Sequence, residues 1–246
     1  MKITEDVYIV GGGIYGIGIS SDLDCNVFVI DGGNEIMIID AGVGVETDII
    51  LKNMEKEALD ISKVNKLLLT HTHLDHSGGA ADIKKTLGAE IYVSEIEADF
   101  IETGDEEAIG LPLARKTGVY PENYSLVPVD VDHRLKGDEY ITVGKYTVRV
   151  IPTPGHSKGS ISVLLETSDK NILFSGDTVF FGGALGLLNM PDSSLADYKI
   201  GIGNLKGLSV DCLLPSHSGF TVGKGQVHID KAIEALAGLG VPKMLN

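Results

Sequence analysis

The fold of this chain is decided by the stretch Lys66-Leu67-Leu68-Leu69-Thr70-His71-Thr72-His73-Leu74-Asp75-His76-Ser77-Gly78-Gly79. Its leucine run predicts a strand, and the Ser-Gly-Gly at its end could open a helix. Four potential metal ligands lie between them within six residues. Histidine and aspartate are rarely buried unless they are paired or bound to a metal, so this cluster at a strand-to-loop junction indicates a functional site.

The spacing of these ligands suits two neighbouring metal ions. From an extended backbone, His71 and His73 can face one point, while the turn that follows carries Asp75 and His76 toward a second point. A set of imidazoles and carboxylates without cysteine favours zinc, iron or manganese over copper. The alternative interpretation is a polar turn with solvent-exposed histidines.

Three later segments share one form, a β-rich run that ends in a glycine-containing turn with one ligand-type residue. They are Pro152-Thr153-Pro154-Gly155-His156-Ser157, Phe174-Ser175-Gly176-Asp177-Thr178 and Leu214-Pro215-Ser216-His217-Ser218-Gly219. A single loop histidine is usually solvated or hydrogen-bonded, so each segment alone is weak. In this order after the histidine-rich run, the three segments strengthen one another.

Hydrophobic patterns predict an α/β fold in which strands outnumber helices. The predicted strands are residues 7–10, 27–30, 36–39, 66–69, 91–93, 146–151, 161–165, 172–174 and 212–214. The predicted helices are residues 48–59, 79–86, 194–205, with Ser193 or Ser194 as cap, and 228–239. Two hairpins, residues 26–40 and 161–177, each end in an aspartate; a duplicated half or chance similarity would explain this echo.

The motifs together resemble the metallo-β-lactamase superfamily, from Ile38-Ile39-Asp40-Ala41-Gly42 through Ser216-His217-Ser218-Gly219. The resemblance implies a four-layer αββα sandwich, two mixed β-sheets flanked by helices, with the site at the sheet edges. It implies a first metal held by His71, His73 and His156, a second held by Asp75, His76 and His217, and Asp177 as the bridge between them. Asp40 would orient a ligand imidazole through its free ring nitrogen, or would cap a turn.

A mechanism follows from such a site. A water between two metals would have a lowered pKa and attack a carbonyl or phosphorus, while the metals stabilise the oxyanion. Asp75 is the expected catalytic residue, because it can orient this water and relay its proton to the leaving group.

Within the superfamily, the sequence favours a thioesterase or lactonase similar to glyoxalase II. The antibiotic-degrading enzymes have cysteine or serine where this chain has Asp177. The arginine motif and helical tail for glutathione are missing, which argues against glutathione specificity. The alternatives are a phosphodiesterase, a single-iron persulfide dioxygenase, or a non-catalytic binding protein stabilised by metal.

Four further residues are candidates for substrate contact. Leu187 and Met190 could form an apolar pocket wall, although ordinary core packing would also explain them. Lys158 could meet a carboxylate or phosphate, or be a solvated surface lysine. Tyr198 could aid an oxyanion. The two remaining histidines, His133 and His228, are expected at the surface.

Composition limits the other possibilities. The chain reads as a single domain, 1–246, in which residues 95–130 form an acidic insertion that could cover the site. With 35 acidic and 20 basic residues, the formal charge of -15 disfavours nucleic acid as a partner. No signal pattern or membrane-spanning run is evident, so we expect a cytoplasmic protein with a small-molecule substrate; the oligomeric state stays open. Cys25 and Cys212 are expected to be buried thiols.

A glycine-rich segment near the start imitates a dinucleotide-binding motif. Gly11-Gly12-Gly13-Ile14-Tyr15-Gly16 follows a strand-like run, but residues 17–25 do not predict the helix that such a site requires. We therefore expect a flexible glycine loop near the mouth of the site.

Overall fold

The computed structural model describes residues 1–238 and 242–245, and two β-sheets form its centre. The first sheet has the order β1 (Val7–Gly11), β2 (Val27–Asp31), β3 (Ile36–Ile39), β4 (Val64–Leu68), β5 (Glu90–Ser94), β6 (His133–Leu135). The second has the order β11 (Cys212–Pro215), β10 (Asn171–Gly176), β9 (Ile161–Glu166), β8 (Tyr146–Pro152), β7 (Glu139–Val143). Each sheet mixes parallel and antiparallel pairs, as expected.

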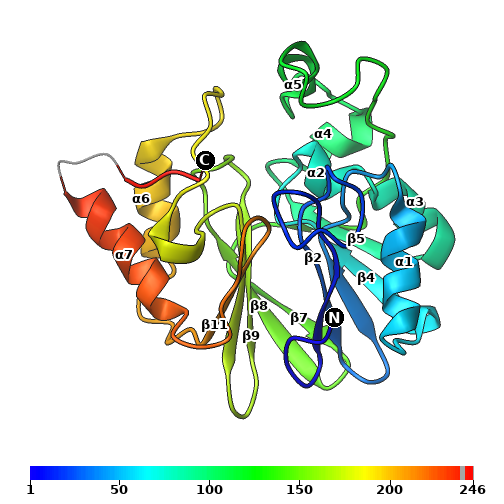
Figure 1. Cartoon of the computed structure of the whole chain (residues 1–246), viewed down its shortest axis with the longest axis horizontal. Coiled ribbons are helices and arrows are strands. Elements are labelled where there is room, and N and C mark those ends of the chain that lie inside the picture. Colours follow the sequence, from blue (N-terminus) through cyan, green and yellow to red (C-terminus); the bar gives the residue numbers. More distant parts are fainter. Residues whose placement is uncertain (239–241, 246) are drawn as a thin grey trace.

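Helices cover the outer face of each sheet (Figure 1). On the first sheet lie α1 (Thr47–Lys56), α3 (Ala80–Leu87) and α4 (Ala98–Thr103), with α5 (Leu111–Lys116) beyond them. On the second lie α6 (Leu195–Gly203) and α7 (Gln226–Ala237). The remaining helical elements are α2 (Leu74–Ser77), η1 (Ile61–Lys63) and η2 (Phe181–Gly183).

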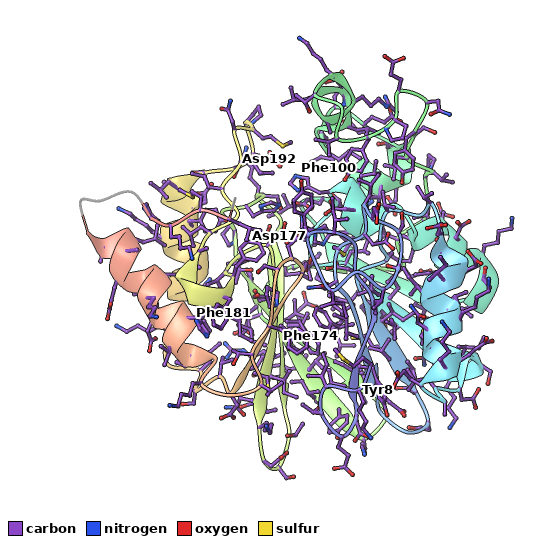
Figure 2. The ribbon with its side chains drawn as sticks, in the orientation of Figure 1. Tyr8, Phe100, Phe174, Asp177, Phe181 and Asp192 are labelled. Atoms are coloured by element: carbon purple, nitrogen blue, oxygen red, sulfur yellow. The ribbon has the colours of Figure 1, made fainter. Side chains whose placement is uncertain are left out.

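Three apolar clusters separate these four layers. One lies between the first sheet and its helices, one between the two sheets, and one between the second sheet and α6 and α7. The middle cluster includes Phe28 and Phe174, whose rings meet edge to face with centroids 5.5 Å apart. Figure 2 labels Phe174 in the centre of the molecule. Because both faces of each sheet are covered, the central strands are near-continuous runs of Val, Ile and Leu. The predicted αββα sandwich is confirmed.

The predicted strands and helices are found with small shifts at their ends. Ser194 caps α6, since its side chain accepts a hydrogen bond from the backbone N–H of Asp197. The last predicted helix is α7, but its expected final residue, Leu239, lies outside the described residues. The two similar hairpins, residues 26–40 and 161–177, are both antiparallel strand pairs. Each hairpin is followed by a strand that pairs in parallel with its second strand, β4 or β11.

Some elements differ from the sequence prediction. The short edge strands β6 and β7 and the helices α2, α4 and α5 were not predicted. Residues 95–130 are not a simple loop, because α4 and α5 lie within them. None of the described helices is long and apolar enough to cross a membrane.

The glycine-rich segment continues from β1 into a loop, and residues 12–26 are not helical. At Gly13, a Cβ atom would lie 2.2 Å from the carbonyl oxygen of Asp22, so the close approach of two backbone segments requires glycine there. Ile14, Tyr15 and Gly16 line a pocket, which places this loop near its mouth as expected.

Candidate metal centre

All the expected ligands follow the carboxyl ends of strands at one edge of the sandwich. His71 and His73 come after β4, His156 after β8, Asp177 after β10 and His217 after β11. Parallel strands β3 and β4, and β10 and β11, bring their carboxyl ends to the same edge of each sheet. The topology thus collects residues that are far apart in sequence at one place.

The histidine-rich run changes conformation midway. Residues 69–73 are not helical, and His73 is the residue that precedes the one-turn helix α2. His71 and His73 therefore alternate along extended backbone, whereas Asp75 and His76 project from the helical turn. The structure matches the local geometry that the sequence suggested.

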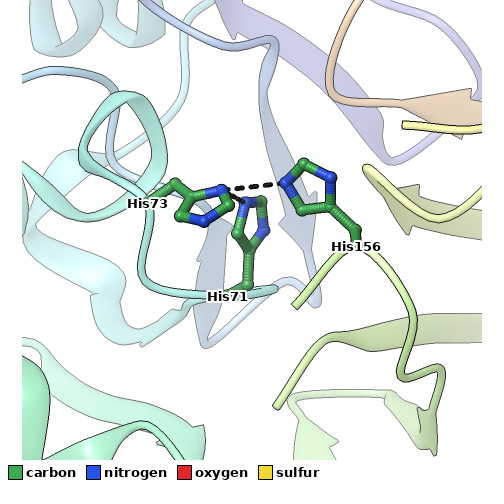
Figure 3. A group of neighbouring side chains, drawn as sticks. All are labelled: His71, His73 and His156. Atoms are coloured by element: carbon green, nitrogen blue, oxygen red, sulfur yellow. Dashed lines mark hydrogen bonds between the residues drawn. The ribbon is translucent and has the colours of Figure 1, made fainter. Parts of the chain in front are cut away.

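His71, His73 and His156 bring three ring nitrogens together (Figure 3). Nδ1 of His73 lies 3.1 Å from Nε2 of His71 and 2.8 Å from Nε2 of His156. A neutral imidazole has one N–H and one lone pair, so a single proton can satisfy few of these contacts. We call these three residues the first triad.

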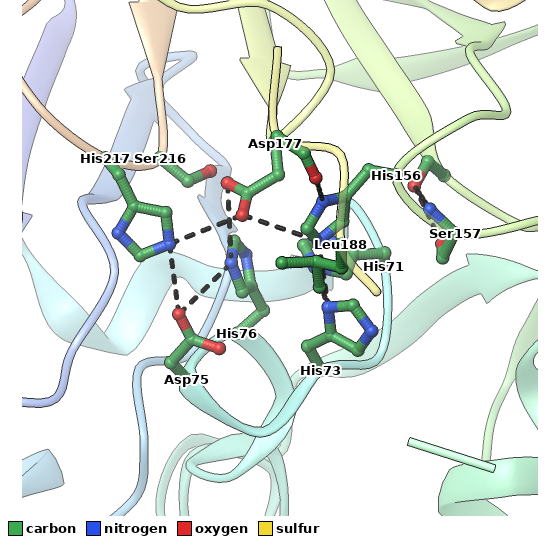
Figure 4. Close-up of polar contacts among 12 residues, drawn as sticks. His71, His73, Asp75, His76, His156, Ser157, Asp177, Leu188, Ser216 and His217 are labelled. Carbon is green, nitrogen blue, oxygen red and sulfur yellow. Dashed lines mark hydrogen bonds and ion pairs between the residues drawn. The ribbon is translucent and has the colours of Figure 1, made fainter. Parts of the chain in front are cut away.

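Asp75, His76 and His217 form the second triad beside it (Figure 4). Nε2 of His217 lies 3.0 Å from Oδ2 of Asp75, and Nε2 of His76 lies 3.5 Å from the same oxygen. Asp177 stands between the triads: its carboxylate oxygens lie 3.5 Å from His156, 3.4 Å from His217 and 3.7 Å from His76.

The chemistry of this donor set fits divalent metal ions. Two buried atoms that face the centre, Nε2 of His76 and Oδ1 of Asp177, have no hydrogen-bond partner. Buried polar atoms without partners are costly, and a cation would satisfy both. With two triads and a carboxylate between them, the residues could hold two ions.

Protonation of the ligands is strongly perturbed by the site. Burial, together with neighbouring His156, lowers the pKa of His73 to about 3. Burial also lowers the pKa of His76, but Asp75 and Asp40 outweigh it and raise that pKa to about 9. Burial would raise the pKa of Asp177, but His217 and His76 hold it well below its usual range. A carboxylate that stays ionised beside imidazoles is suited to bind a cation.

Asp40 lies behind the second triad and is fully buried. Its Oδ2 accepts hydrogen bonds from Nδ1 of His76, at 2.9 Å, and from the hydroxyl of Ser216, and its Oδ1 accepts one from the backbone N–H of Thr70. It therefore occupies the position expected for orienting a ligand imidazole. Cys25 lies near Asp40 and His76, but burial raises the pKa of its thiol well above the usual value.

Glu97 holds the first triad in a similar way, and no motif in the sequence singles it out. This buried carboxylate accepts hydrogen bonds from the backbone N–H and hydroxyl of Thr72, between His71 and His73. Its other oxygen accepts bonds from the hydroxyl of Ser157, next to His156, and from the N–H of Gly159. One side chain thus fixes both segments that carry the first triad.

His156 is also held from the opposite side. Its Nδ1 donates to the carbonyl oxygen of Gly186, so Nε2 is left to face the centre. A Cβ atom on Gly186 would lie 2.6 Å from the carbonyl oxygen of Asp177 and 3.0 Å from Nδ1 of His156. Glycine is therefore required where this loop passes the ligands.

A pocket of about 590 Å³ opens onto the two triads. Leu187 and Leu188 line it, from the segment where the sequence suggested an apolar wall. Tyr120, from the 95–130 insertion, also lines it, and its hydroxyl lies 3.4 Å from Oδ1 of Asp75. The insertion therefore does cover part of the site, and Tyr120 is a residue that the sequence analysis missed.

The other suggested substrate contacts lie elsewhere. Lys158 and Met190 line a separate groove beside Phe100 and Asp192. Tyr198 is fully buried, and its hydroxyl donates to the backbone carbonyl of Asp177 at 3.1 Å, so it supports the ligand loop and does not reach the pocket. Its expected role at an oxyanion is wrong for this physical reason.

The two histidines outside the motifs differ in exposure. His133 is exposed as expected, stacked on Tyr92 with its Nε2 3.1 Å from Glu90. His228 is buried, so its expected surface position is wrong. Its Nδ1 accepts a hydrogen bond from the N–H of Gly182, which holds the side chain against η2. Cys25 and Cys212 are buried free thiols, as predicted.

Two known proteins are similar to this chain in sequence over most of its length. The acyl-coenzyme A thioesterase MBLAC2 of Gallus gallus is 30% identical over 208 residues, covering 78% of this chain and 72% of that protein. A probable metallo-hydrolase of Methanocaldococcus jannaschii is 27% identical over 207 residues, covering 82% of this chain and 89% of that protein.

Solved structures show a similar fold. The native FEZ-1 metallo-β-lactamase of Legionella gormanii aligns with a TM-score of 0.72 at 19% identity, covering 94% of this chain and 91% of that one. BJP-1, a subclass B3 metallo-β-lactamase of Bradyrhizobium japonicum, aligns with a TM-score of 0.69 at 25% identity, covering 99% and 84%. A family model described as the metallo-beta-lactamase superfamily matches residues 21–217, which include every ligand above. The chain therefore belongs to the metallo-β-lactamase superfamily.

Proposed function

We propose that this protein is a hydrolase with two divalent metal ions, most simply zinc, that cleaves a small ester-type substrate, a thioester or a lactone. The observation that carries the proposal is the pair of adjacent triads with Asp177 between them. When bound, such ions would activate water as a nucleophile and stabilise the negative charge on the attacked carbonyl oxygen.

Asp75 is the residue that we assign to proton transfer. It lines the pocket, and its pKa stays below the usual range because His76 and His217 outweigh the effect of burial. An ionised carboxylate at this place can accept a hydrogen bond from the attacking water and then pass a proton toward the leaving group. Tyr120 can hold the outer oxygen of Asp75 and thereby limit its rotation.

The remaining residues fix the geometry of the ligands. Asp40 and Glu97 hold the second and first triads, and Gly186 directs His156 toward the centre. Ester and thioester hydrolysis benefits from this rigidity, because fixed charges need no rearrangement as the oxyanion forms. The relative named as an acyl-coenzyme A thioesterase supports an acyl substrate.

The test is a substrate panel with zinc-reconstituted protein: a thioester, a lactone, a phosphodiester and a β-lactam. We expect hydrolysis of the thioester or the lactone, and its loss in His156→Ala. His133→Ala is the matched control, since His133 lies outside the pocket. Turnover of the phosphodiester or the β-lactam alone would refute the substrate class. In the protein as isolated, one iron per chain together with oxygen consumption on a persulfide would refute the hydrolase.

A further inference from the structure

The mouth of the metal pocket is rimmed by exposed apolar side chains. Ile14, Tyr15, Val119, Leu188 and Leu245 all line the pocket and are between 36% and 64% exposed. They come from the glycine loop, the insertion, the loop after Asp177 and the C-terminal segment. We call these five residues the apolar rim. Exposed apolar side chains that gather at one opening mark a binding surface.

The rim is continuous with the metal centre. Leu188 lines the same pocket as His73 and His156, with which it is drawn in Figure 4, and Leu187 and Phe180 line that pocket too. The loop that carries Leu187 and Leu188 is anchored, since Gly186 accepts the hydrogen bond from His156 and the N–H of Leu188 donates to the hydroxyl of Ser193. An apolar group could therefore extend from the reacting carbonyl to the mouth of the pocket.

Lysine and arginine are absent from the described residues that line this pocket. Among the described residues that line it, the ionisable ones are the five ligands His73, Asp75, His156, Asp177 and His217, together with two tyrosines, and neither lysine nor arginine is present. Phosphate and carboxylate groups are usually recognised by lysine and arginine. Lys158, the basic residue nearest in sequence to His156, lines the separate groove with Met190.

On the basis of the proposed function, we propose that the substrate is an uncharged ester-type molecule with an extended apolar acyl chain, which lies against the apolar rim. The strongly acidic chain, with a formal charge of -15, further opposes a polyanionic leaving group such as that of coenzyme A. In the hydrolysis of a thioester, the water oxygen bonds to the acyl carbon and the C–S bond breaks. The products are a carboxylic acid and a neutral thiol that carries the transferred proton.

The test compares thioesters that differ in one feature at a time. Acetyl and decanoyl thioesters of N-acetylcysteamine, which is neutral, measure the effect of the chain, and decanoyl-coenzyme A measures the effect of charge. We expect kcat/KM to rise at least tenfold from acetyl to decanoyl. We also expect the neutral decanoyl thioester to be hydrolysed at least as efficiently as decanoyl-coenzyme A. A preference for acetyl, or a tenfold preference for the coenzyme A thioester, would overturn the proposal.

A charge placed in the apolar rim tests whether the acyl chain binds there. Leu188→Glu should reduce the decanoyl-to-acetyl ratio of kcat/KM at least tenfold, because the added carboxylate must be desolvated against the chain. Ile200→Glu, at an exposed apolar position on α6 outside the pocket, should leave the ratio unchanged. If Leu188→Glu leaves the ratio unchanged but dissociates a dimer, the rim is an interface between copies, and the proposal is wrong.

Binding of the S-decyl thioether of N-acetylcysteamine, which has no carbonyl next to sulfur and cannot be hydrolysed, separates this proposal from the function itself. If no ester-type substrate is hydrolysed but the S-decyl thioether binds at least tenfold more tightly than the S-ethyl thioether, the hydrolase assignment fails and the rim assignment stands. If thioesters are hydrolysed without preference for chain length, the rim assignment fails and the hydrolase stands.

Discussion

Glu97 and Asp40 are two buried carboxylates that each support a different triad. Glu97 holds Thr72 and Ser157, the neighbours of the first-triad histidines, whereas Asp40 holds His76 of the second triad directly. Outer hydrogen bonds of this kind orient ligands and strengthen metal binding. The two carboxylates should therefore act on different metal ions.

Glu97→Gln is expected to weaken the binding of a metal ion by the first triad and to leave binding by the second triad unchanged. The NH₂ group of glutamine cannot accept a hydrogen bond, so it would replace one of the two accepting oxygens and face a hydrogen-bond donor. The affinity for that ion should therefore fall about tenfold to a hundredfold. Calorimetric zinc titration measures both binding steps. Glu95→Gln, at an exposed neighbour paired with Lys136, is the matched control. Equal weakening of both steps in Glu97→Gln would contradict the assignment.

Asp75→Asn separates metal binding from turnover. The amide oxygen can still serve as a ligand, but it cannot accept a proton, so partial metal binding should persist while kcat falls about a hundredfold or more. Measurement of kcat beside metal content checks this. Full activity in this variant would remove Asp75 from the mechanism.

The ligands were predictable because their order along the chain carries the signal. His71, His156, Asp177 and the others are the residues that the sequence placed in the site, and the fold brings them together. Glu97 could not be found in this way, since it is one of many acidic residues in a charged segment. Tyr198 shows the opposite error, because its burial behind Asp177 depends on packing that no local pattern shows.

At the scale of elements, Glu35 joins the turn between β2 and β3 to the turn between β7 and β8. Its carboxylate accepts hydrogen bonds from the N–H of Gly144 and from Asn65, and it pairs with Lys66. Nearby, the N–H of Lys145 donates to the carbonyl of Gly32. These contacts tie the two sheets together at their hairpin turns, away from the metal centre.

This link predicts a pH dependence of stability. The hydrogen bond from Gly144, with those from Asn65 and Lys66, lowers the pKa of Glu35 from 4.5 to about 2. The ionised carboxylate of Glu35 therefore contributes fully to folding stability above pH 4.5, and this contribution is lost as the pH falls toward 2. Glu35→Gln should cost about 1 kcal/mol at pH 7, a value reduced by solvent screening.

Urea unfolding at pH 7 and pH 3 checks the role of Glu35. The difference in unfolding free energy between wild type and Glu35→Gln should shrink at the lower pH. A difference that is unchanged or larger at pH 3 would show that the carboxylate does not act through its ionised form.

Elements buried on both faces were the most predictable. Strands such as β3 and β10 consist largely of apolar residues, so they stand out from sequence alone. The edge strand β6 has the sequence His-Arg-Leu with two exposed residues, and α4 and α5 are six residues each. Tertiary contacts, not a local hydrophobic period, define these short elements.

At the scale of the whole molecule, metal binding should contribute to stability. A ligand that binds only the folded state at a hundred times its dissociation constant adds about 2.7 kcal/mol. For a chain of this size, that corresponds to a rise in Tm of about 5 to 10 °C. Calorimetry with and without chelator should show this difference, and His156→Ala should show a smaller one. Equal Tm values would contradict a metal centre coupled to the fold.

The most direct test of the two-metal centre is the number of ions that the folded chain binds. Chelator-treated protein would be titrated with zinc while bound metal is counted by mass spectrometry and hydrolysis is followed in the same samples. The two triads with Asp177 between them predict saturation at two ions per chain, with hydrolysis reaching its maximum at the same point. Saturation at one ion, or activity that is independent of metal, would contradict the account.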